Sequence, residues 1–315
     1  MGIASMSFVT RSIAAAVFAA PLIAFSAPAD AGIGDLLVAP TRLVLDGGRG
    51  AEIVLNNIGE EPATYRISVE FRRMEKDGTL EDVTEPTAAD KAAADMIIYA
   101  PRRVTLAPHE PQAIRIAARP AQGLPDGEYR VHMLFRAIPP ANPVVQQAST
   151  ESEKGLRFKL TPIYGVTIPV IVRLGNLQAT AGIANVHLDK TSEGAPEVAV
   201  DLTRSGSRST FGEVRVFKSG VKNPIALQKA VAVYTEIGAR HVSVQLADAD
   251  LEKKSPAELV NMAREMGIEG ASTMSKQDVI NAILKVRATG PVTVQYVETF
   301  DDGEHVIAET KTVLR

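Results

Sequence analysis

The stretch that decides the fold runs from residue 158 to residue 173 and reads FKLTPIYGVTIPVIVR. Every second residue in it is apolar, and these residues are Phe158, Leu160, Pro162, Tyr164, Val166, Ile168, Val170 and Val172. Successive side chains of a β-strand point to opposite faces, so this pattern predicts a long strand with one apolar face. Two prolines lie within it, which indicates a strand at the edge of a sheet, because proline has no N–H to donate to a central ladder.

Similar short alternating runs lie on both sides of this stretch, separated by Gly, Pro, Asp and Asn. They predict strands of a first domain at residues 36–45, 52–56, 65–71, 112–117, 128–138 and 158–173, with a short helix at 87–95. A second set is predicted at residues 179–189, 197–203, 212–218, 230–234, 241–246, 291–296 and 305–313. Many short strands with regular turns are typical of antiparallel sandwiches. We therefore expect an all-β protein of two immunoglobulin-like sandwiches, with a boundary near residue 174.

One segment of the second half departs from the β pattern. Ser255 and Glu258 form a capping-box motif, Pro256 follows at the first helical position, and Gly267 ends the predicted helix. A second helix is predicted to begin after Ser275. The second domain is therefore expected to carry a small helical insert at about residues 252–287.

The first 31 residues have the order of a secretory signal peptide. One positive charge precedes a short apolar stretch, and small residues ending at Ala31 follow it. Cleavage there predicts a mature protein outside the cytoplasm, with an N-terminal domain at residues 32–174 and a C-terminal domain at residues 175–315. The chain has no cysteine, so the fold depends on hydrophobic burial and backbone pairing. Its net charge of −3 offers no broad basic surface.

The sequence lacks the motifs of common catalytic and metal sites. Its five histidines are far apart, and none stands at metal-ligand spacing with a carboxylate. No nucleophile elbow, zinc-protease motif or phosphate-binding loop is present. We therefore expect no catalytic residue, no metal, no cofactor and no small-molecule substrate, and we interpret the chain as a binding protein rather than an enzyme.

Several separated segments of the first domain carry a family resemblance. They are PTRLVLDG at residues 40–47, APRRVTLAP at 100–108, QAIRI at 112–116, GEYRV at 127–131 and FRAIPP at 135–140. In this order and spacing, residues 35–174 resemble the N-terminal domain of the PapD-like periplasmic chaperones that assemble pili. The resemblance implies two immunoglobulin-like domains in a boomerang arrangement, a pilin-like subunit as client and an outer-membrane usher as the second partner. It also implies that the last strand of the first domain completes the client's unfinished sandwich.

The resemblance assigns roles to individual residues. The client-binding set is Arg42, Leu160, Pro162, Tyr164, Val166 and Ile168, in which Arg42 matches the arginine that anchors the client's terminal carboxylate. The family's anchoring lysine falls on Pro169, so Arg173 or Lys159 is a candidate replacement. The alternative for the apolar face, above all from Val166 to Val172, is that it packs into the domain's own core.

The resemblance also implies an ion pair between the domains. Glu128 and Arg173 match two members of a triad that fixes the interdomain angle. The third, acidic position falls near Thr299, and Glu298 or Asp301 is a candidate replacement.

The insert resembles the small helical module at the N-terminus of transcription terminator Rho. Between residues 252 and 287 it has six basic and five acidic residues, a net charge of +1. Phosphate binding needs clustered positive charge, so we favour a structural or docking role and expect no nucleic-acid partner. Two alternatives to the chaperone stay open: a secreted structural or adhesive sandwich protein, and a nucleic-acid binder acting through the insert.

Overall fold

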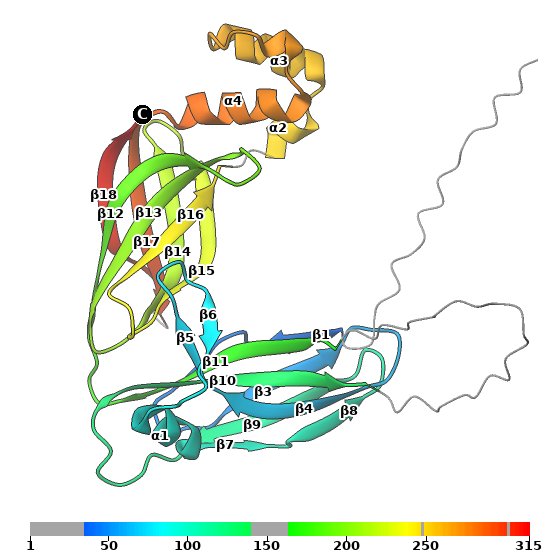
Figure 1. Ribbon diagram of the computed structural model, residues 1–315, viewed down its shortest axis with the longest axis vertical. Coiled ribbons are helices and arrows are strands. Elements are labelled where there is room, and N and C mark those ends of the chain that lie inside the picture. Colours follow the sequence, from blue (N-terminus) through cyan, green and yellow to red (C-terminus); the bar gives the residue numbers. More distant parts are fainter. Residues whose placement is uncertain (1–34, 140–162, 247–248, 301–302) are drawn as a thin grey trace, which may run out of the picture. The chain divides into compact units, whose positions relative to one another are not determined.

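The computed structural model describes residues 35–139, 163–246, 249–300 and 303–315 (Figure 1). The first sandwich consists of two sheets. In one the strand order is β1 (Leu36–Ala39), β3 (Ala51–Asn57), β9 (Pro111–Ala118) and β7 (Ile97–Ala100). In the other it is β2 (Leu43–Leu45), β11 (Gly165–Leu174), β10 (Gly127–Ile138), β4 (Ala63–Glu70) and β8 (Arg103–Leu106). Inward-facing residues of both sheets, among them Ile53, Tyr65 and Phe135, form its core.

The chain passes from one sheet to the other just before β2. Strand β1 pairs antiparallel with β3, whereas β2 pairs parallel with β11 in the opposite sheet. The prediction of one continuous strand from Leu36 to Leu45 is therefore wrong. A bend at residues 40–42 divides it, and Pro40 cannot donate a hydrogen bond to a ladder at this point.

Helix α1 (Ala88–Met96) lies at the end of the first sandwich and confirms the predicted helix. Thr87 caps it, since its hydroxyl accepts a hydrogen bond from the Asp90 amide while the Asp90 carboxylate accepts one from the Thr87 amide. Ala93 and Met96 bury its apolar side in the first core.

The second sandwich follows directly. Its sheets have the orders β12 (Ala179–Lys190), β13 (Pro196–Gly206), β16 (Ala239–Gln245), and β15 (Ala226–Val233), β14 (Thr210–Lys218), β17 (Gly290–Phe300), β18 (Gly303–Leu314). Each predicted strand of this half overlaps one of these strands. With the first sandwich, this confirms the all-β class and the two sandwiches.

The helical insert lies between β16 and β17. It contains α2 (Ala249–Lys253), α3 (Pro256–Glu265), a 3₁₀ turn at Ala271–Thr273, and α4 (Lys276–Ala288). Ser255 and Glu258 form the predicted capping box. Figure 1 shows the helices beyond the end of the sandwich at which the C-terminus lies. Their apolar side chains, such as Leu251, Leu259 and Ile283, belong to the same core as the strands of the second sandwich. No helix in the described part of the chain has the length and hydropathy needed to cross a membrane.

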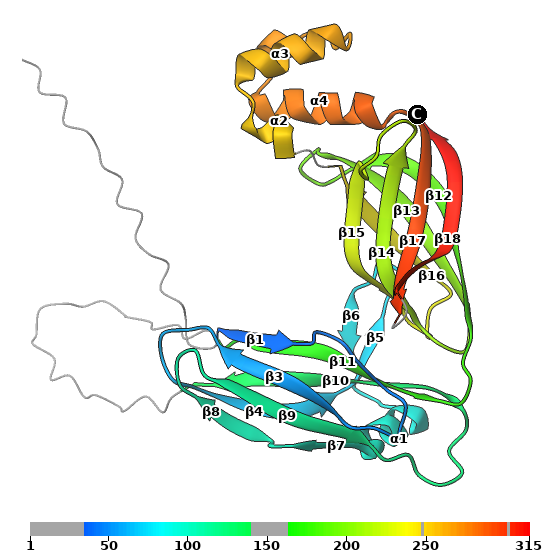
Figure 2. The same cartoon turned by 180° about the vertical axis from the view of Figure 1, so that it is seen from behind.

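A short hairpin that the sequence patterns did not predict links the two sandwiches. It consists of β5 (Arg72–Met74) and β6 (Leu80–Asp82), which pair antiparallel (Figures 1 and 2). The His241 amide of β16 donates a 2.7 Å hydrogen bond to the Lys76 carbonyl in the hairpin turn. Met74 packs with Ile171 of the first sandwich and with Ala232 and Tyr234 of the second.

Candidate functional site

The outer side of β11 is only partly covered. On its inner side, β11 pairs with β10 along its whole length, from Gly165 opposite Arg136 to Leu174 opposite Gly127. On its outer side, β2 covers only the three residues 170–172. Among the described residues, β11 is therefore paired on both sides at residues 170–172, and its outer edge is unpaired at residues 165–169.

The register shows which backbone groups that edge presents. The Ala137 amide donates to the Tyr164 carbonyl at 2.9 Å, so even-numbered residues direct their backbone groups toward β10. The odd-numbered residues Gly165, Thr167 and Pro169 consequently direct theirs outward. Pro169 has no N–H to lose there, which explains why the strand contains a proline without losing a bond to β10.

The predicted client-binding side chains divide into three groups. Leu160 and Pro162 lie outside the described residues. Tyr164 is 51% exposed at the open end of the ladder. Val166 is partly buried and Ile168 is only 2% exposed, and both pack against the core of their own sandwich. In this state of the protein, Tyr164 is the described member of the set that is available to a partner.

Arg42 lies at the bend before β2 and points into the contact between the sandwiches. Its guanidinium lies 4.6 Å from the centre of the Phe211 ring and 5.9 Å from that of Tyr234, and its Nη2 atom donates to the Ser209 hydroxyl at 3.3 Å. Its Nη1 atom is buried and has no hydrogen-bond partner among the described residues. Burial lowers the pKa of Arg42. A buried N–H without an acceptor costs about 1–3 kcal/mol, which a carboxylate ligand would offset.

The position expected for a second anchoring cation holds no cation. Pro169 lies opposite His132 in the ladder. Of the two candidate replacements, Arg173 donates to Glu128 and Lys159 lies outside the described residues. The structure therefore places a single predicted anchor, Arg42, in the described part of this region.

Glu128 and Arg173 form a buried ion pair beside Arg42. The Arg173 Nε atom lies 3.0 Å from a Glu128 carboxylate oxygen, and the Glu128 side chain is 1% exposed. Ser209 of the second sandwich contacts both residues, because its amide donates to Glu128 at 3.0 Å and its carbonyl accepts from Arg173 at 3.1 Å. The expected pair is thus present and reaches across to the second sandwich.

Glu298 does not contact this pair directly. It binds Arg208 through two hydrogen bonds of 2.9 and 3.0 Å, and Arg208 in turn donates to the Ser209 carbonyl. Thr299 is exposed, and Asp301 lies outside the described residues. Arg208 and Ser209 therefore stand between Glu298 and the pair, an arrangement that sequence spacing alone did not indicate.

A second charged contact was missed by the sequence patterns. Arg130 of β10 donates to the Oε2 atom of Glu236 at 3.0 Å, and the other carboxylate oxygen, Oε1, accepts a 2.9 Å hydrogen bond from the Met74 amide of the hairpin. Burial alone would raise the pKa of Glu236, but the bonds and charge of Arg130 hold it below its ordinary value. The Arg130 guanidinium also lies 3.8 Å from the centre of the Tyr234 ring.

His132 is buried next to this contact. It is 1% exposed, and neither ring nitrogen has a hydrogen-bond partner among the described residues. Burial, aided by the charges of Arg130 and Arg72, lowers its pKa to about 3. The imidazole is therefore neutral at neutral pH.

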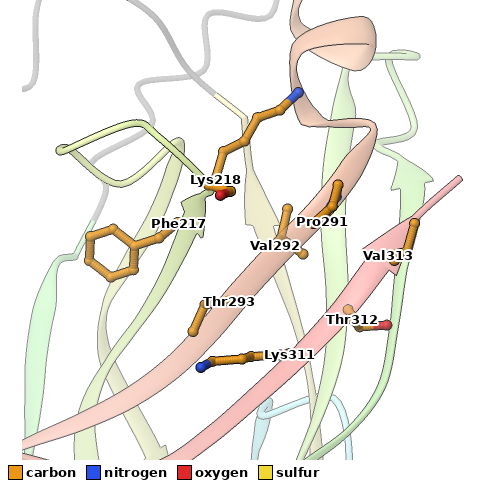
Figure 3. A pocket seen from close by; sticks show the side chains of 9 residues that line it. Phe217, Lys218, Pro291, Val292, Thr293, Lys311, Thr312 and Val313 are labelled. Atoms are coloured by element: carbon orange, nitrogen blue, oxygen red, sulfur yellow. The ribbon is translucent and has the colours of Figure 1, made fainter.

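The described residues contain no cluster of three or more histidine, aspartate or glutamate side chains that could hold a metal. A surface cavity of about 460 Å³ lies on the second sandwich, between the ends of β14, β17 and β18 (Figure 3). Lys218 at its rim donates to the Arg287 carbonyl, and to that of Thr289 at 2.9 Å, and so satisfies carbonyls at the end of α4. That lysine has a structural role in the insert.

Comparisons with known proteins give two kinds of match. The family model of the Rho termination factor, N-terminal domain, matches residues 250–291. No curated protein matches the chain.

The solved structures that match include fimbrial chaperones. A YadV chaperone is 11% identical, with 89% of this chain and 100% of that chain covered and a TM-score of 0.41. The CupB2 chaperone of Pseudomonas aeruginosa is 12% identical, with 89% and 100% covered and a TM-score of 0.40. The CsuC–CsuE chaperone–tip adhesion subunit pre-assembly complex of Acinetobacter baumannii is 10% identical, with 89% and 97% covered and a TM-score of 0.40.

Proposed function

We propose that this protein is a non-enzymatic periplasmic chaperone. It binds an incomplete, pilin-like sandwich subunit by adding the open edge of β11 to the subunit's sheet, and it delivers that subunit to an outer-membrane usher. The observation that carries the proposal is the unpaired outer edge of β11 at residues 165–169, beside the exposed side chain of Tyr164. An open strand edge is a template for pairing with another chain.

The backbone of this edge supplies the recognition. Gly165 and Thr167 each offer an outward N–H and C=O to an incoming strand, and Pro169 offers a C=O alone. Side chains on the apolar face then select the partner, and Tyr164 is the most exposed of the described residues on this face. Leu160 and Pro162 extend this face in the sequence, so we propose the same role for them.

Arg42 suits a carboxylate at the end of the client chain. A guanidinium can donate two parallel hydrogen bonds to a carboxylate, and the Nη1 atom of Arg42 has donors to spare. Nη1 is closed off from solvent, and the rings of Phe211 and Tyr234 lie beside the same guanidinium, so a client carboxylate that reaches Nη1 must displace groups around it. Client binding should therefore change the environment of these two rings.

The edge proposal is tested by Thr167→Pro, with Thr167→Val as the matched control. Both variants lose the 3.1 Å hydrogen bond from the Thr167 hydroxyl to Glu70, but only the proline loses the outward amide. Tagged wild type and variants are used to capture clients from periplasmic extract, and the polypeptide that the wild type captures is quantified for each. We expect about a tenfold loss with proline and little change with valine.

Hydrogen–deuterium exchange gives an independent reading. Residues 163–168 should exchange more slowly in the complex than in the free protein, because the outward amides become bonded. Equal capture by the proline variant, or unchanged exchange in this segment, would refute strand addition and would favour a secreted structural or adhesive sandwich protein.

The second candidate function, nucleic-acid binding, is favoured by the Rho-type match at residues 250–291. Two of the basic residues there are engaged within the insert, since Lys276 donates to the Glu252 carbonyl and Lys253 lies 3.6 Å from Asp250. A gel-shift assay with single-stranded RNA over a salt series tests it. Binding that weakens steeply with salt and disappears in Lys285→Gln would support this function.

A further inference from the structure

Three arginines lie side by side on the outer face of the first sandwich. Arg103 of β8 is opposite Arg66 of β4, and Arg66 is opposite Arg136 of β10. Residues opposite each other on neighbouring strands share a face, and all three side chains are exposed. We call Arg103, Arg66 and Arg136 the arginine row. With strands about 4.8 Å apart, it spans about 10 Å across the sheet.

The described part of the chain supplies no acidic partner for the row. Like charges directly opposite one another destabilise a sheet. Elsewhere the protein avoids this cost, since Arg115 pairs with Glu52 across two strands and Arg215 contacts Glu213 and Glu304. No such ion pair is formed by a member of the arginine row within the described residues. Three adjacent cations without a counter-charge favour a ligand that brings negative charge.

The surroundings of the row indicate what kind of anion it binds. A surface cavity of about 320 Å³ is lined by the three arginines together with Ala137, Ile138, Pro139 and Ile163. Ile163 is an exposed apolar side chain at its rim. A ligand that fills this cavity must therefore contact apolar groups as well as guanidinium groups. A polypeptide that carries carboxylate and apolar side chains on the same face does both, whereas a bare phosphate does not.

The spacing agrees with such a ligand. In an extended peptide, carboxylates on every second residue are about 7 Å apart, so two of them fit within the length of the row. Guanidinium groups bind carboxylates through paired hydrogen bonds, which a lysine cannot make. Beyond Arg136, the next position of the register is Gly165, which has no side chain to compete for the anion.

We propose that the arginine row and its apolar rim form a binding site for an acidic segment of a polypeptide partner. The site lies beside the backbone edge of β11 but acts through side chains of the outer face, so its recognition of charge does not depend on the proposed strand addition. Its chemistry requires two carboxylates two residues apart, with an apolar side chain next to them on the same face of the peptide to contact Ile138 and Ile163.

The test uses the full-length mature protein and a capped hexapeptide with glutamate at positions 1 and 3, leucine at position 5 and serine at positions 2, 4 and 6, so that the glutamates and the leucine share a face when the peptide is extended. Fluorescence anisotropy of the labelled peptide is measured at low and physiological salt. We expect binding by the wild type and at least a tenfold loss in Arg66→Gln/Arg136→Gln. The matched control is Arg49→Gln/Arg115→Gln, which removes the same charge from outside the row and should bind within a factor of two of the wild type.

Three further arms can overturn the proposal. Equal binding of a peptide with glutamine in place of glutamate would show that the row does not recognise charge. Binding of polyphosphate or of phosphatidylglycerol vesicles, but not of the glutamate peptide, would assign the row to phosphate groups. Tighter peptide binding after Glu151→Gln/Glu153→Gln would show that the chain's own carboxylates occupy the row.

A direct reading on the wild type does not depend on any variant. The Nε–H resonances of arginine side chains report guanidinium contacts, and those of the arginine row should shift as the glutamate peptide is added. The row variants should also melt no lower than the wild type, because they relieve like-charge repulsion. Absent resonance shifts at saturating peptide would exclude the site.

Discussion

The two halves of β11 have opposite surroundings. At residues 170–172 the strand is bonded to both β10 and β2, and its C-terminal half lies against the contact between the sandwiches, where Ile171 and Arg173 meet residues of the second one. From Gly165 to Pro169 it is bonded to β10 alone in the described structure. The difference teaches that one strand can be paired on both sides at one end and open at the other. A partner that pairs with the open half therefore leaves the contact between the two sandwiches in place.

The largest loss of stability is expected from a variant that disrupts the contact between the two sandwiches. Glu236→Gln removes one partner of a largely buried ion pair and leaves Arg130 uncompensated, which typically costs about 3–5 kcal/mol. Urea unfolding should show this loss. The matched control is Glu52→Gln at the exposed pair with Arg115, where a change below about 1 kcal/mol is expected. If both variants lose less than about 1 kcal/mol of unfolding free energy, the contact between the sandwiches does not depend on the Arg130–Glu236 pair.

A pair of truncations compares the two halves directly. Ile171→Ala removes a fully buried side chain from the cluster that joins the sandwiches, which should cost about 2–4 kcal/mol in urea unfolding. Tyr164→Ala removes an exposed one and should cost less than about 0.5 kcal/mol. Client capture should respond in the opposite way, with the larger loss for Tyr164→Ala. Similar stability losses for both would contradict the division of β11.

A change of pH is expected to have a smaller effect on the free energy of unfolding. The group responsible is His132, which lies opposite Pro169 at the border of the two halves of β11. Its pKa falls from an ordinary value near 6.5 to about 3 in the folded protein. Between these values the unfolded chain binds a proton that the folded chain does not, so stability falls as the pH falls. From pH 7 to pH 5 the expected loss is about 2 kcal/mol.

The contribution of His132 can be isolated by substitution. In His132→Leu, this part of the pH dependence of urea unfolding should disappear. In His187→Gln, which changes an exposed histidine of the second sandwich, it should remain. An unchanged slope in His132→Leu would assign the pH dependence to other groups.

Much of the fold could be predicted because long strands and capped helices leave local patterns. Alternation located β10 and β12, Ala-rich composition indicated the helix at residues 87–95, and the pair Ser255 with Glu258 marked the start of α3. The hairpin of β5 and β6 escaped because three-residue strands are too short for a period to be recognised, and because Met74 is buried by the second sandwich rather than by its neighbours in sequence.

The candidate site was predicted less completely, for a physical reason. The Glu128–Arg173 pair lies on two adjacent strands, and the family pattern was enough to propose it. Arg42 instead meets Phe211 and Tyr234, which are more than 160 residues away in the sequence, and Glu236 lies in a turn without periodicity. Side chains that meet only after two domains dock leave no local signal.

The short parallel strand β2 has a consequence for any incoming polypeptide. Since it occupies the side of β11 at residues 170–172, a foreign strand cannot advance past Pro169 in that direction. At about 3.3 Å per residue, the five positions from 165 to 169 give an unpaired edge about 16 Å long, which ends where β2 begins to pair with β11. The strand β2 would thus set the register in which a partner strand pairs with β11.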